Sequence, residues 1–421
     1  MAAKYVHVVT KGDTSEHHVN TTSLSSLPPL EDGKVRAKSL LVGLTSNNMA
    51  YATQGTRMHW WDTFPVPADL PSPFNNQDLY GIVPCWGYGE ILESRIKGID
   101  TGRLIWGFWP SSDLPVDLKL TKAGIEGHYI DISEHRSQLM NAYQRYMLAD
   151  PSLSAASLDD EKVFEKLARA ANCRAVWEAG YLINKAIFGQ PPVHPVGVGE
   201  WSAETADLSS AVVVSLSGSG RTARSFTDNV FHSHQDGTGP LAFLAITSNP
   251  KANIFRQPPI PTTVVSYADS TTKSTLEWIA QQKPKKIVVV DFGGRDNAFD
   301  SLFSAIANAF SDLDVMAIGV GAEAKAHSAE DVGKLIQRNE LSNRTMMNTT
   351  GIRDAMMKSL GEVEYWQGVE KAWLGFLERG SVDDLKIEVG EGVAGDRGFE
   401  RGWSDLSVGK LAVDGAKVYK M

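Results

Sequence analysis

The stretch AVVVSLSGSGRTA, residues 211–223, decides the fold of this chain. A run that reads as a buried strand leads directly into Gly218, Gly220 and Ala223, in the order G-x-G-x-x-A, and then into a predicted helix. In such a turn the first glycine permits the tight bend, the second lets a pyrophosphate approach the backbone, and the small third residue lets helix and strand pack closely. The free N–H groups at the start of the helix attract phosphate. The stretch therefore predicts a nucleotide-binding turn, with a merely structural tight turn as the alternative.

Further strand-like runs follow this turn: LAFLAITS, TTVVSYAD, KKIVVVDFGG and DVMAIGVG. They are apolar almost throughout, as the strands of a parallel sheet covered by helices on both faces must be. Helical or polar segments separate them. The pattern predicts a doubly wound α/β domain over residues 173–364, and it shows no clear sixth strand after Gly321.

The carboxyl ends of these strands are where a ligand binds in an open parallel sheet. After the second strand, where a dehydrogenase that prefers NAD places an acidic residue, the chain has Ser248, Asn249 and Lys251. Hydroxyl, amide and lysine groups suit a 2′-phosphate, so NADP is the expected cofactor, and a solvated turn is the alternative. The residues expected to bind the cofactor are Ser217, Gly218, Ser219, Gly220, Arg221, Thr222, Ser248, Asn249, Lys251, Asp291, Gly293 and Gly319.

The part of the chain before the glycine loop reads mostly as strands and turns, in VHVVTKG, KVRAKSLLVGL, GIVPCWGYGEILES and GRLIWGFWP. Helical spacing is expected to begin at Ser137, and a second helix is expected over 160–171. A long helix or helix pair is expected over 354–379, after which the tail returns to strand composition. We therefore expect a mostly antiparallel β domain built from 1–172 and 365–421.

Composition excludes several classes of protein. At 421 residues and 42% hydrophobic content, the chain is long enough for two globular domains. A net charge of -9 without a basic cluster argues against a nucleic-acid partner. Because the chain shows neither an apolar stretch of about 18–20 residues nor a signal-like start, we expect no membrane span and a cytoplasmic location. The two cysteines, Cys85 and Cys173, lie in apolar settings and are expected to pack in the core.

Several stretches carry a resemblance to a known group. A β domain before the glycine loop and a returning tail after it are similar to the medium-chain dehydrogenase/reductase superfamily. Within it the chain resembles a divergent microbial family of uncharacterised proteins, in the segments SNNMAYATQG (46–55), WWDTFPVP (60–67), WGYGEILES (86–94), EHRSQLMNAYQRYM (134–147), LAITSN (244–249) and VVVDFGG (288–294). The resemblance implies a GroES-like β domain followed by a Rossmann-type domain, and NADP use.

Zinc-dependent members of the superfamily carry a cysteine in the early loop and a G-H-E run soon after it. This chain has SNNMAY and VPCWGYGE at the comparable places, so no metal is expected. Its close histidine pairs, His17 with His18 and His232 with His234, lack zinc-site spacing and are expected on the surface.

Four polar residues of the first domain are the catalytic candidates: Tyr51, Asp62, His135 and Tyr143. A phenol or imidazole can protonate a carbonyl oxygen or an enolate carbon while a hydride arrives from the cofactor. The simpler alternatives are an Asp62–arginine pair, a core position for Tyr143, and a helix-start role for His135. Tyr51 is the first candidate.

Aromatic residues are dense in the first domain and allow two interpretations. They can line a pocket for a planar, apolar substrate, or form the core of a small β domain, which we favour for most of them: Trp60, Trp61, Phe64, Trp86, Trp106, Phe108 and Trp109. The segment YLINK (181–185) mimics a catalytic Tyr–Lys pair, but it precedes the glycine loop and is expected on a helix surface.

The leading functional hypothesis is a zinc-free, NADPH-dependent reductase. Its substrate would be a carbonyl or an activated C=C bond in a small apolar metabolite of polyketide-like or aromatic type. The rival is a hydrolase, lyase or cyclase on the same fold that uses Tyr51, Asp62 or His135 as acid or base, since fold alone does not decide function. A binding protein without catalysis is a weaker third possibility. For the assembly we expect a homodimer, the commonest form of soluble oligomer.

Overall fold

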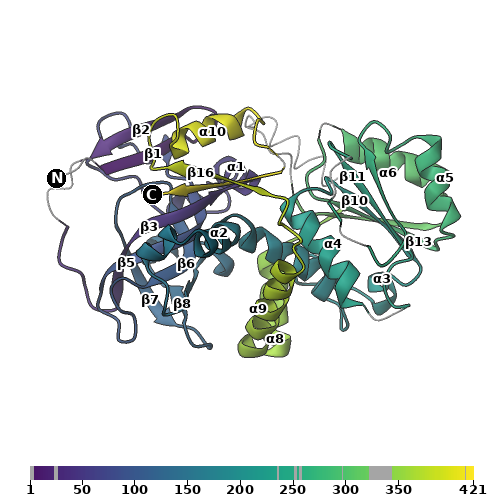
Figure 1. Cartoon of the computed structure of the whole chain (residues 1–421), viewed down its shortest axis with the longest axis horizontal. Coiled ribbons are helices and arrows are strands. Elements are labelled where there is room, and N and C mark those ends of the chain that lie inside the picture. Colours follow the sequence, from purple (N-terminus) through teal and green to yellow (C-terminus); the bar gives the residue numbers. More distant parts are fainter. Residues whose placement is uncertain are drawn as a thin grey trace. The chain divides into compact units, whose positions relative to one another are not determined.

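The described part of the chain divides into two compact units in the computed structural model. It comprises residues 4–22, 27–234, 237–250, 254–255, 258–295, 297–321, 344–412 and 414–421. The first unit holds the described residues up to Ala175 and from Leu385 onward, and the second holds those from Val176 to Asp384. The tail thus returns to the unit in which the chain starts (Figure 1).

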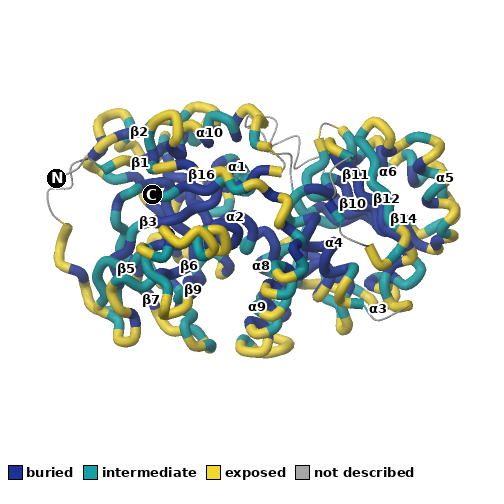
Figure 2. The backbone as a smooth tube through the Cα atoms, viewed as in Figure 1, coloured by how far each residue is buried: buried dark blue, intermediate teal, exposed yellow. Residues whose placement is uncertain are grey.

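The second unit is built on a six-stranded parallel sheet in the order β12-β11-β10-β13-β14-β15, as far as its described residues go. Every residue of β10, β11 and β13 is buried, and Figure 2 draws the backbone of β10 and β11 in dark blue. This is the continuous apolar texture that a sheet covered on both faces requires. The strands are β10 (Ala211–Leu216), β11 (Ala242–Thr247), β12 (Thr262–Ser266), β13 (Lys286–Asp291), β14 (Asp314–Gly319) and β15 (Arg344–Met346).

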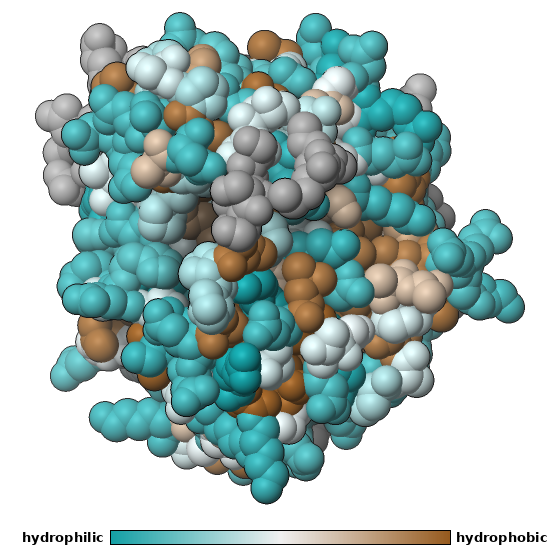
Figure 3. Space-filling model, turned by 90° about the vertical axis from the view of Figure 1, so that its left-hand side faces the viewer, coloured by the Kyte–Doolittle hydropathy of each residue, from teal (hydrophilic) through white to brown (hydrophobic). Residues whose placement is uncertain are grey.

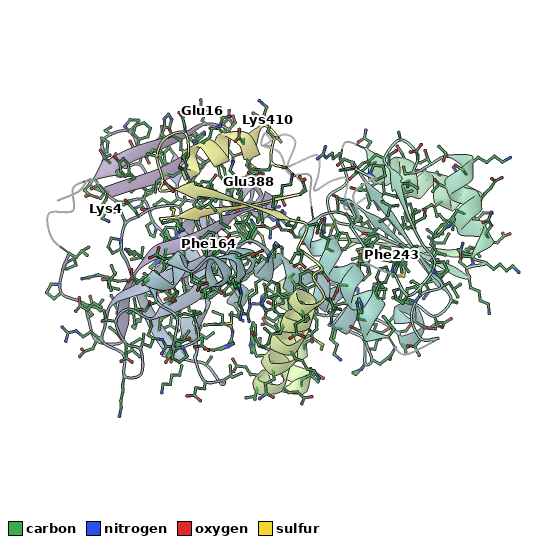
Figure 4. The ribbon with its side chains drawn as sticks, viewed as in Figure 1. Lys4, Glu16, Phe164, Phe243, Glu388 and Lys410 are labelled. Carbon is green, nitrogen blue, oxygen red and sulfur yellow. The ribbon has the colours of Figure 1, made fainter. Side chains whose placement is uncertain are left out.

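Helices complete this unit and cover the sheet. Phe243 of β11, labelled in Figure 4, is fully buried and contacts the rings of Phe226 and Phe231 from α4. The helices are α3 (Ala203–Ala206), α4 (Arg221–Ser233), α5 (Lys273–Gln281), α6 (Ala298–Ala309), α8 (Thr349–Leu360) and α9 (Glu362–Glu378). The predicted doubly wound domain is confirmed, and the expected helix over 354–379 is the pair α8 and α9.

The first unit contains an eight-stranded sheet in the order β16-β17-β3-β5-β6-β9-β8-β7. β7 also pairs with β3, so part of the sheet closes on itself into a small barrel. A three-stranded sheet, β2-β1-β4, lies in the same unit. The strands are β1 (Lys4–Thr10), β2 (His17–Thr22), β3 (Lys34–Leu44), β4 (Tyr80–Gly81), β5 (Pro84–Ser94), β6 (Leu104–Pro110), β7 (Val116–Lys122), β8 (His128–Asp131), β9 (Arg145–Leu148), β16 (Lys386–Glu391) and β17 (Gly415–Lys420).

Helices and short turns connect these strands. They are α1 (Ser46–Thr53), η1 (Trp60–Asp62), η2 (Glu134–Arg136), η3 (Asn141–Tyr143), η4 (Ala155–Asp159), α2 (Glu161–Leu182) followed by the π turn η5 (Ile183–Ile187), and α10 (Phe399–Ser407). The unit boundary falls within α2. On the face shown in Figure 3, apolar residues form patches between hydrophilic ones.

The helix expected to begin at Ser137 does not form, so that prediction is wrong. The segment instead makes the turns η2 and η3 and then β9. Its Arg136 side chain is fully buried and donates to Asp131 at 2.5 Å and to the Tyr146 hydroxyl at 2.8 Å. These tertiary bonds to a buried guanidinium outweigh a helical spacing of apolar residues, because a buried charge must find its partners.

The helix α9 lies in the second unit, whereas we had assigned residues from 365 onward to the first domain. Its Trp373 contacts Trp177 at a ring distance of 5.3 Å. After the helix, Arg379 pairs with Asp228 of α4. Asp384, the last residue of this unit, accepts a bidentate pair from Arg224, also of α4. These contacts hold the chain to the second unit as far as Asp384.

Candidate functional site

The glycine loop connects β10 to α4. Ser217 adopts a left-handed φ of 64°, and Gly218 donates its N–H to the Ile246 carbonyl at 2.8 Å. A Cβ on Gly218 would lie 3.0 Å from the Ala245 Cβ, and one on Gly220 would lie 3.2 Å from the Ser217 carbonyl. A side chain at Gly218 would therefore press on β11 and one at Gly220 on the loop itself, so both positions favour glycine, as the predicted phosphate-binding turn does.

The helix α4 starts at Arg221 with Gly220 as its N-cap, and no side chain caps it. Arg221 and Thr222, in its first turn, are half-buried. A helix start without a capping side chain leaves backbone N–H groups that a phosphate can satisfy. The loop thus fits a dinucleotide pyrophosphate in both shape and polarity.

Polar side chains surround the loop. The Thr247 hydroxyl, at the end of β11, donates to the buried Ser219 hydroxyl at 2.7 Å. The Tyr267 hydroxyl hydrogen-bonds with Ser217, which lowers the Tyr267 pKa, although burial raises it more. Tyr267 was missed from the sequence, and its only signal was its position directly after the strand-like run TTVVS.

Asp291 lies at the expected edge of the sheet, but its carboxylate serves the chain itself. One oxygen accepts from the N–H groups of Gly293 and Gly294 at 3.0 and 2.7 Å, and the other pairs with Arg344. Gly319 has a packing role, since a Cβ there would lie 2.4 Å from the Met346 sulfur. Asp291 and Gly319 therefore hold the turn after β13 and the short strand β15.

The expected 2′-phosphate residues lie just after β11. Ser248 and Asn249 are exposed there, as a ligand contact requires. Lys251 lies outside the described residues.

In the first unit, Tyr51 lies on α1, which is capped by a reciprocal pair between Thr45 and Asn48. The Tyr51 side chain is 3% exposed, and its hydroxyl accepts from Trp86 Nε1 at 2.9 Å and from Asn47 Nδ2 at 3.4 Å. Burial raises the pKa of Tyr51 well above its usual value, and the neighbouring Tyr143 raises it further. The N–H groups of Trp86 and Asn47 act in the opposite direction, because they stabilise the phenolate.

An aromatic cluster surrounds this hydroxyl. The Tyr51 ring contacts Trp60 at 4.8 Å, Phe108 at 5.1 Å and Tyr143 at 5.8 Å. Trp86 stacks on Trp106 at 4.7 Å. We call these six rings the Tyr51 cluster: Tyr51, Trp60, Trp86, Trp106, Phe108 and Tyr143. All seven aromatic residues singled out from the sequence are buried, as expected of core residues.

Asp62 and His135 have partners outside the Tyr51 cluster. Asp62 is exposed and pairs with His59 at 2.9 Å rather than with an arginine. His135 is exposed, hydrogen-bonds with the backbone of Thr63 and lines a separate cavity. The structure therefore brings together two of the four catalytic candidates, Tyr51 and Tyr143.

The histidine predictions need correction at two positions. His17 is half-buried between His7, at 3.0 Å, and the Ser404 hydroxyl, at 2.9 Å. His234 is half-buried and hydrogen-bonds with Asn184 at 2.9 Å. Both histidines have tertiary partners that sequence spacing cannot show, whereas His18 and His232 are exposed as expected. Among the residues that the structure describes, no group of three or more His, Cys, Asp or Glu side chains is placed to hold a metal ion.

The sequence also made predictions for the two cysteines, the YLINK segment and membrane-spanning helices. Cys85 and Cys173 are fully buried, which confirms their core packing. In the YLINK segment Lys185 is exposed, but Tyr181 is buried and stacks on Trp177, so only part of that segment is helix surface. Within the described ranges, no helix is both long and apolar enough to cross a membrane.

A closed β unit and a parallel-sheet unit with a glycine loop define the medium-chain dehydrogenase/reductase fold, with a GroES-like and a Rossmann-type domain. The chain belongs to the family described as "Protein of unknown function (DUF2855)", which matches residues 42–412. No curated protein sequence matches the chain.

Three solved structures illustrate the likeness of fold. The Etr1p/NADP/crotonyl-CoA complex has a TM-score of 0.54 at 12% identity, with 100% of both chains covered. CurA from Vibrio vulnificus in complex with NADPH has a TM-score of 0.52 at 9% identity, with 99% of both chains covered. A putative NADPH:quinone reductase from Bacillus thuringiensis has a TM-score of 0.51 at 10% identity, with 100% of both chains covered.

Proposed function

We propose that this protein is an NADPH-dependent reductase that works without a catalytic metal. The glycine loop carries the proposal, because two closely packed glycines lead directly into the start of α4, which no side chain caps. Structures of similar fold bear names that include NADP, NADPH or NADPH:quinone reductase. When bound, NADPH supplies a hydride.

The chain's own residues bind this cofactor in two places. Backbone N–H groups of the glycine loop and the first turn of α4 hold the pyrophosphate, and the hydroxyls of Ser217 and Ser219 line the same loop. Ser248, Asn249 and, from the sequence, Lys251 hold the 2′-phosphate. Asp291 and Gly319 shape the sheet edge, and we assign them no direct contact with the cofactor.

Tyr51 supplies the proton. Its oxygen accepts two N–H groups, from Trp86 and Asn47, which leaves its own proton to be given to the carbonyl oxygen or enolate carbon that forms as the hydride arrives. The same two donors stabilise the phenolate that remains. The substrate we propose carries a carbonyl or an activated C=C bond on a small, largely apolar body that suits aromatic surroundings.

Cofactor titration tests the proposal. NADPH added to the full-length protein should bind saturably, followed by calorimetry or by tryptophan fluorescence, and it should bind more tightly than NADH. No binding at millimolar NADPH would remove the reductase assignment and leave the non-redox alternative. If NADPH binds, its oxidation by a panel of enones and quinones identifies the substrate class.

A further inference from the structure

The first unit contains a cavity of about 240 Å³ that the reductase proposal does not use. Most of its lining is apolar and comes from the segment after η1, from the start of β7 and from the residues next to them: Phe64, Ile82, Leu114, Val116 and Leu118. An apolar cavity of about 150 Å³ can hold benzene, so this one has room for a substituted six-membered ring.

Rigid groups shape the walls. Pro65, Pro67, Pro110 and Pro115 all line the cavity. The ring of Phe64 is held in place by the fully buried Arg136, whose guanidinium lies 5.5 Å from the ring centroid. Such walls lose little freedom when a ligand enters, and a rigid ring loses little as well.

Two of the three polar side chains in the lining are already engaged. The Ser112 hydroxyl donates to the Tyr5 carbonyl at 3.1 Å and accepts from the Leu114 N–H at 3.0 Å. The two carboxylate oxygens of Asp117 pair with Arg36 at 2.7 and 2.8 Å. These bonds hold both side chains in place, and each keeps an oxygen lone pair that can accept from a further donor.

His135 is the third polar residue of the lining. The backbone of Thr63 lies beside its ring and favours an N–H on the nearer nitrogen, and an imidazole has a second ring nitrogen. Burial and the neighbouring Arg136 lower the pKa of His135, with Asp131, Thr63 and Asp62 acting in the opposite direction. A neutral imidazole that donates through one nitrogen accepts through the other.

We infer that this cavity binds a small phenol, with its ring between the proline and Phe64 walls and its hydroxyl donating to the second ring nitrogen of His135. The volume selects a single substituted ring, and a side-chain acceptor in a largely apolar lining selects a ligand with one strong donor. None of the six rings of the Tyr51 cluster lines the cavity. Phenol binding is therefore independent of NADPH, and the failure of either proposal can be recognised separately.

The test uses p-cresol and toluene, which differ only in the hydroxyl group. Each is titrated into the full-length protein without NADPH, with ligand-observed NMR as the readout. We expect saturable binding of p-cresol, about two- to tenfold tighter than that of toluene, because one hydrogen bond contributes about 0.5–1.5 kcal/mol. No saturable p-cresol binding, or equal affinity for the two probes, overturns the proposal.

Three variants complete the test. His135→Phe should abolish the preference for p-cresol while toluene still binds, and an unchanged preference overturns the role of His135. Val116→Phe, at a half-buried strand position, should fill the cavity and remove binding of both probes. Val389→Phe, on β16 and outside the lining, is the matched control and should bind both as the wild type does. Retained binding in Val116→Phe would place the ligand elsewhere and overturn the site.

Discussion

Replacement of Tyr51 with phenylalanine removes one hydroxyl from the Tyr51 cluster and leaves the ring in place. That hydroxyl accepts from Trp86 at 2.9 Å and from Asn47 at 3.4 Å. If Tyr51 is the acid of the reaction, its loss should lower turnover by about 10²- to 10⁴-fold, the usual contribution of a positioned proton donor. Binding of NADPH should not change, because the glycine loop belongs to the second unit.

The stability cost of this change follows from the same contacts. Trp86 is 9% exposed, so Tyr51→Phe strands its indole N–H in a buried position, whereas the half-buried Asn47 can turn to water. One stranded buried donor costs about 1–3 kcal/mol. A typical domain has about 5–15 kcal/mol of stability, so the variant should remain folded and its turnover should be measurable.

The assay is the loss of NADPH absorbance in a single turnover with an enone or quinone that the wild type reduces. Tyr143→Phe removes the second phenol of the cluster, to which we assign no proton transfer, and should keep most of the activity. In the wild type, the acid form of Tyr51 exists below its pKa, which burial raises above the usual value of 10.0. Ionisation of Tyr51 should therefore not reduce turnover at any pH below 10.0.

Wild-type turnover in Tyr51→Phe, with circular dichroism and NADPH affinity unchanged, would refute the acid assignment. Trp86→Phe gives a second test, since it keeps the phenol and removes one donor to its oxygen. It should lower turnover by about two- to tenfold, the value of one hydrogen bond. No effect would show that this donor does not stabilise the phenolate.

Three further predictions concern the second unit. Gly218→Val should lower both the free energy of unfolding and the affinity for NADPH, because its Cβ would lie only 3.0 Å from a Cβ of β11 and the turn must shift. A urea titration and calorimetry measure the two effects, and unchanged NADPH affinity would contradict the role of the loop. Lys251→Ala should reduce the affinity for NADPH by about ten- to a hundredfold and leave that for NADH unchanged, since one charged hydrogen bond is worth about 1.5–3 kcal/mol. An unchanged preference would contradict the 2′-phosphate assignment. Glu178→Gln removes the carboxylate that accepts from buried Arg353 at 2.7 and 2.5 Å, so it should lower the free energy of unfolding by about 3–5 kcal/mol. A urea titration measures this free energy, and a change below about 1 kcal/mol would contradict the prediction.

The sequence by itself determined the elements with strong local signals. The strands β10, β11 and β13 are continuous apolar runs, and the glycine loop follows the first of them at the spacing that a tight turn requires. These signals are local because each strand is buried whole and each glycine is fixed by its own turn. The parallel sheet and the order of the two domains could therefore be predicted.

Segments whose structure depends on distant partners could not be predicted in this way. The segment after Arg136 forms turns and a strand in place of the expected helix, because the buried Arg136 side chain needs its partners there. The three-residue strand β15 forms beside β14 without an apolar run of its own. Residues from 365 onward were assigned to the other domain because the contacts of Trp373 with Trp177 and of Arg379 with Asp228 are invisible in the sequence.

The candidate site likewise combines residues that the sequence suggests with contacts that only the structure shows. Tyr51 could be proposed from its segment, but its partner Trp86 lies 35 positions away on β5, and only the tertiary structure shows that this indole donates to the phenol. Equally, only the structure separates His135 from Tyr51 and places it in a cavity lined by proline, since side chains far apart in the sequence meet there. Local patterns determine which elements form, and long-range packing decides which of their side chains act together.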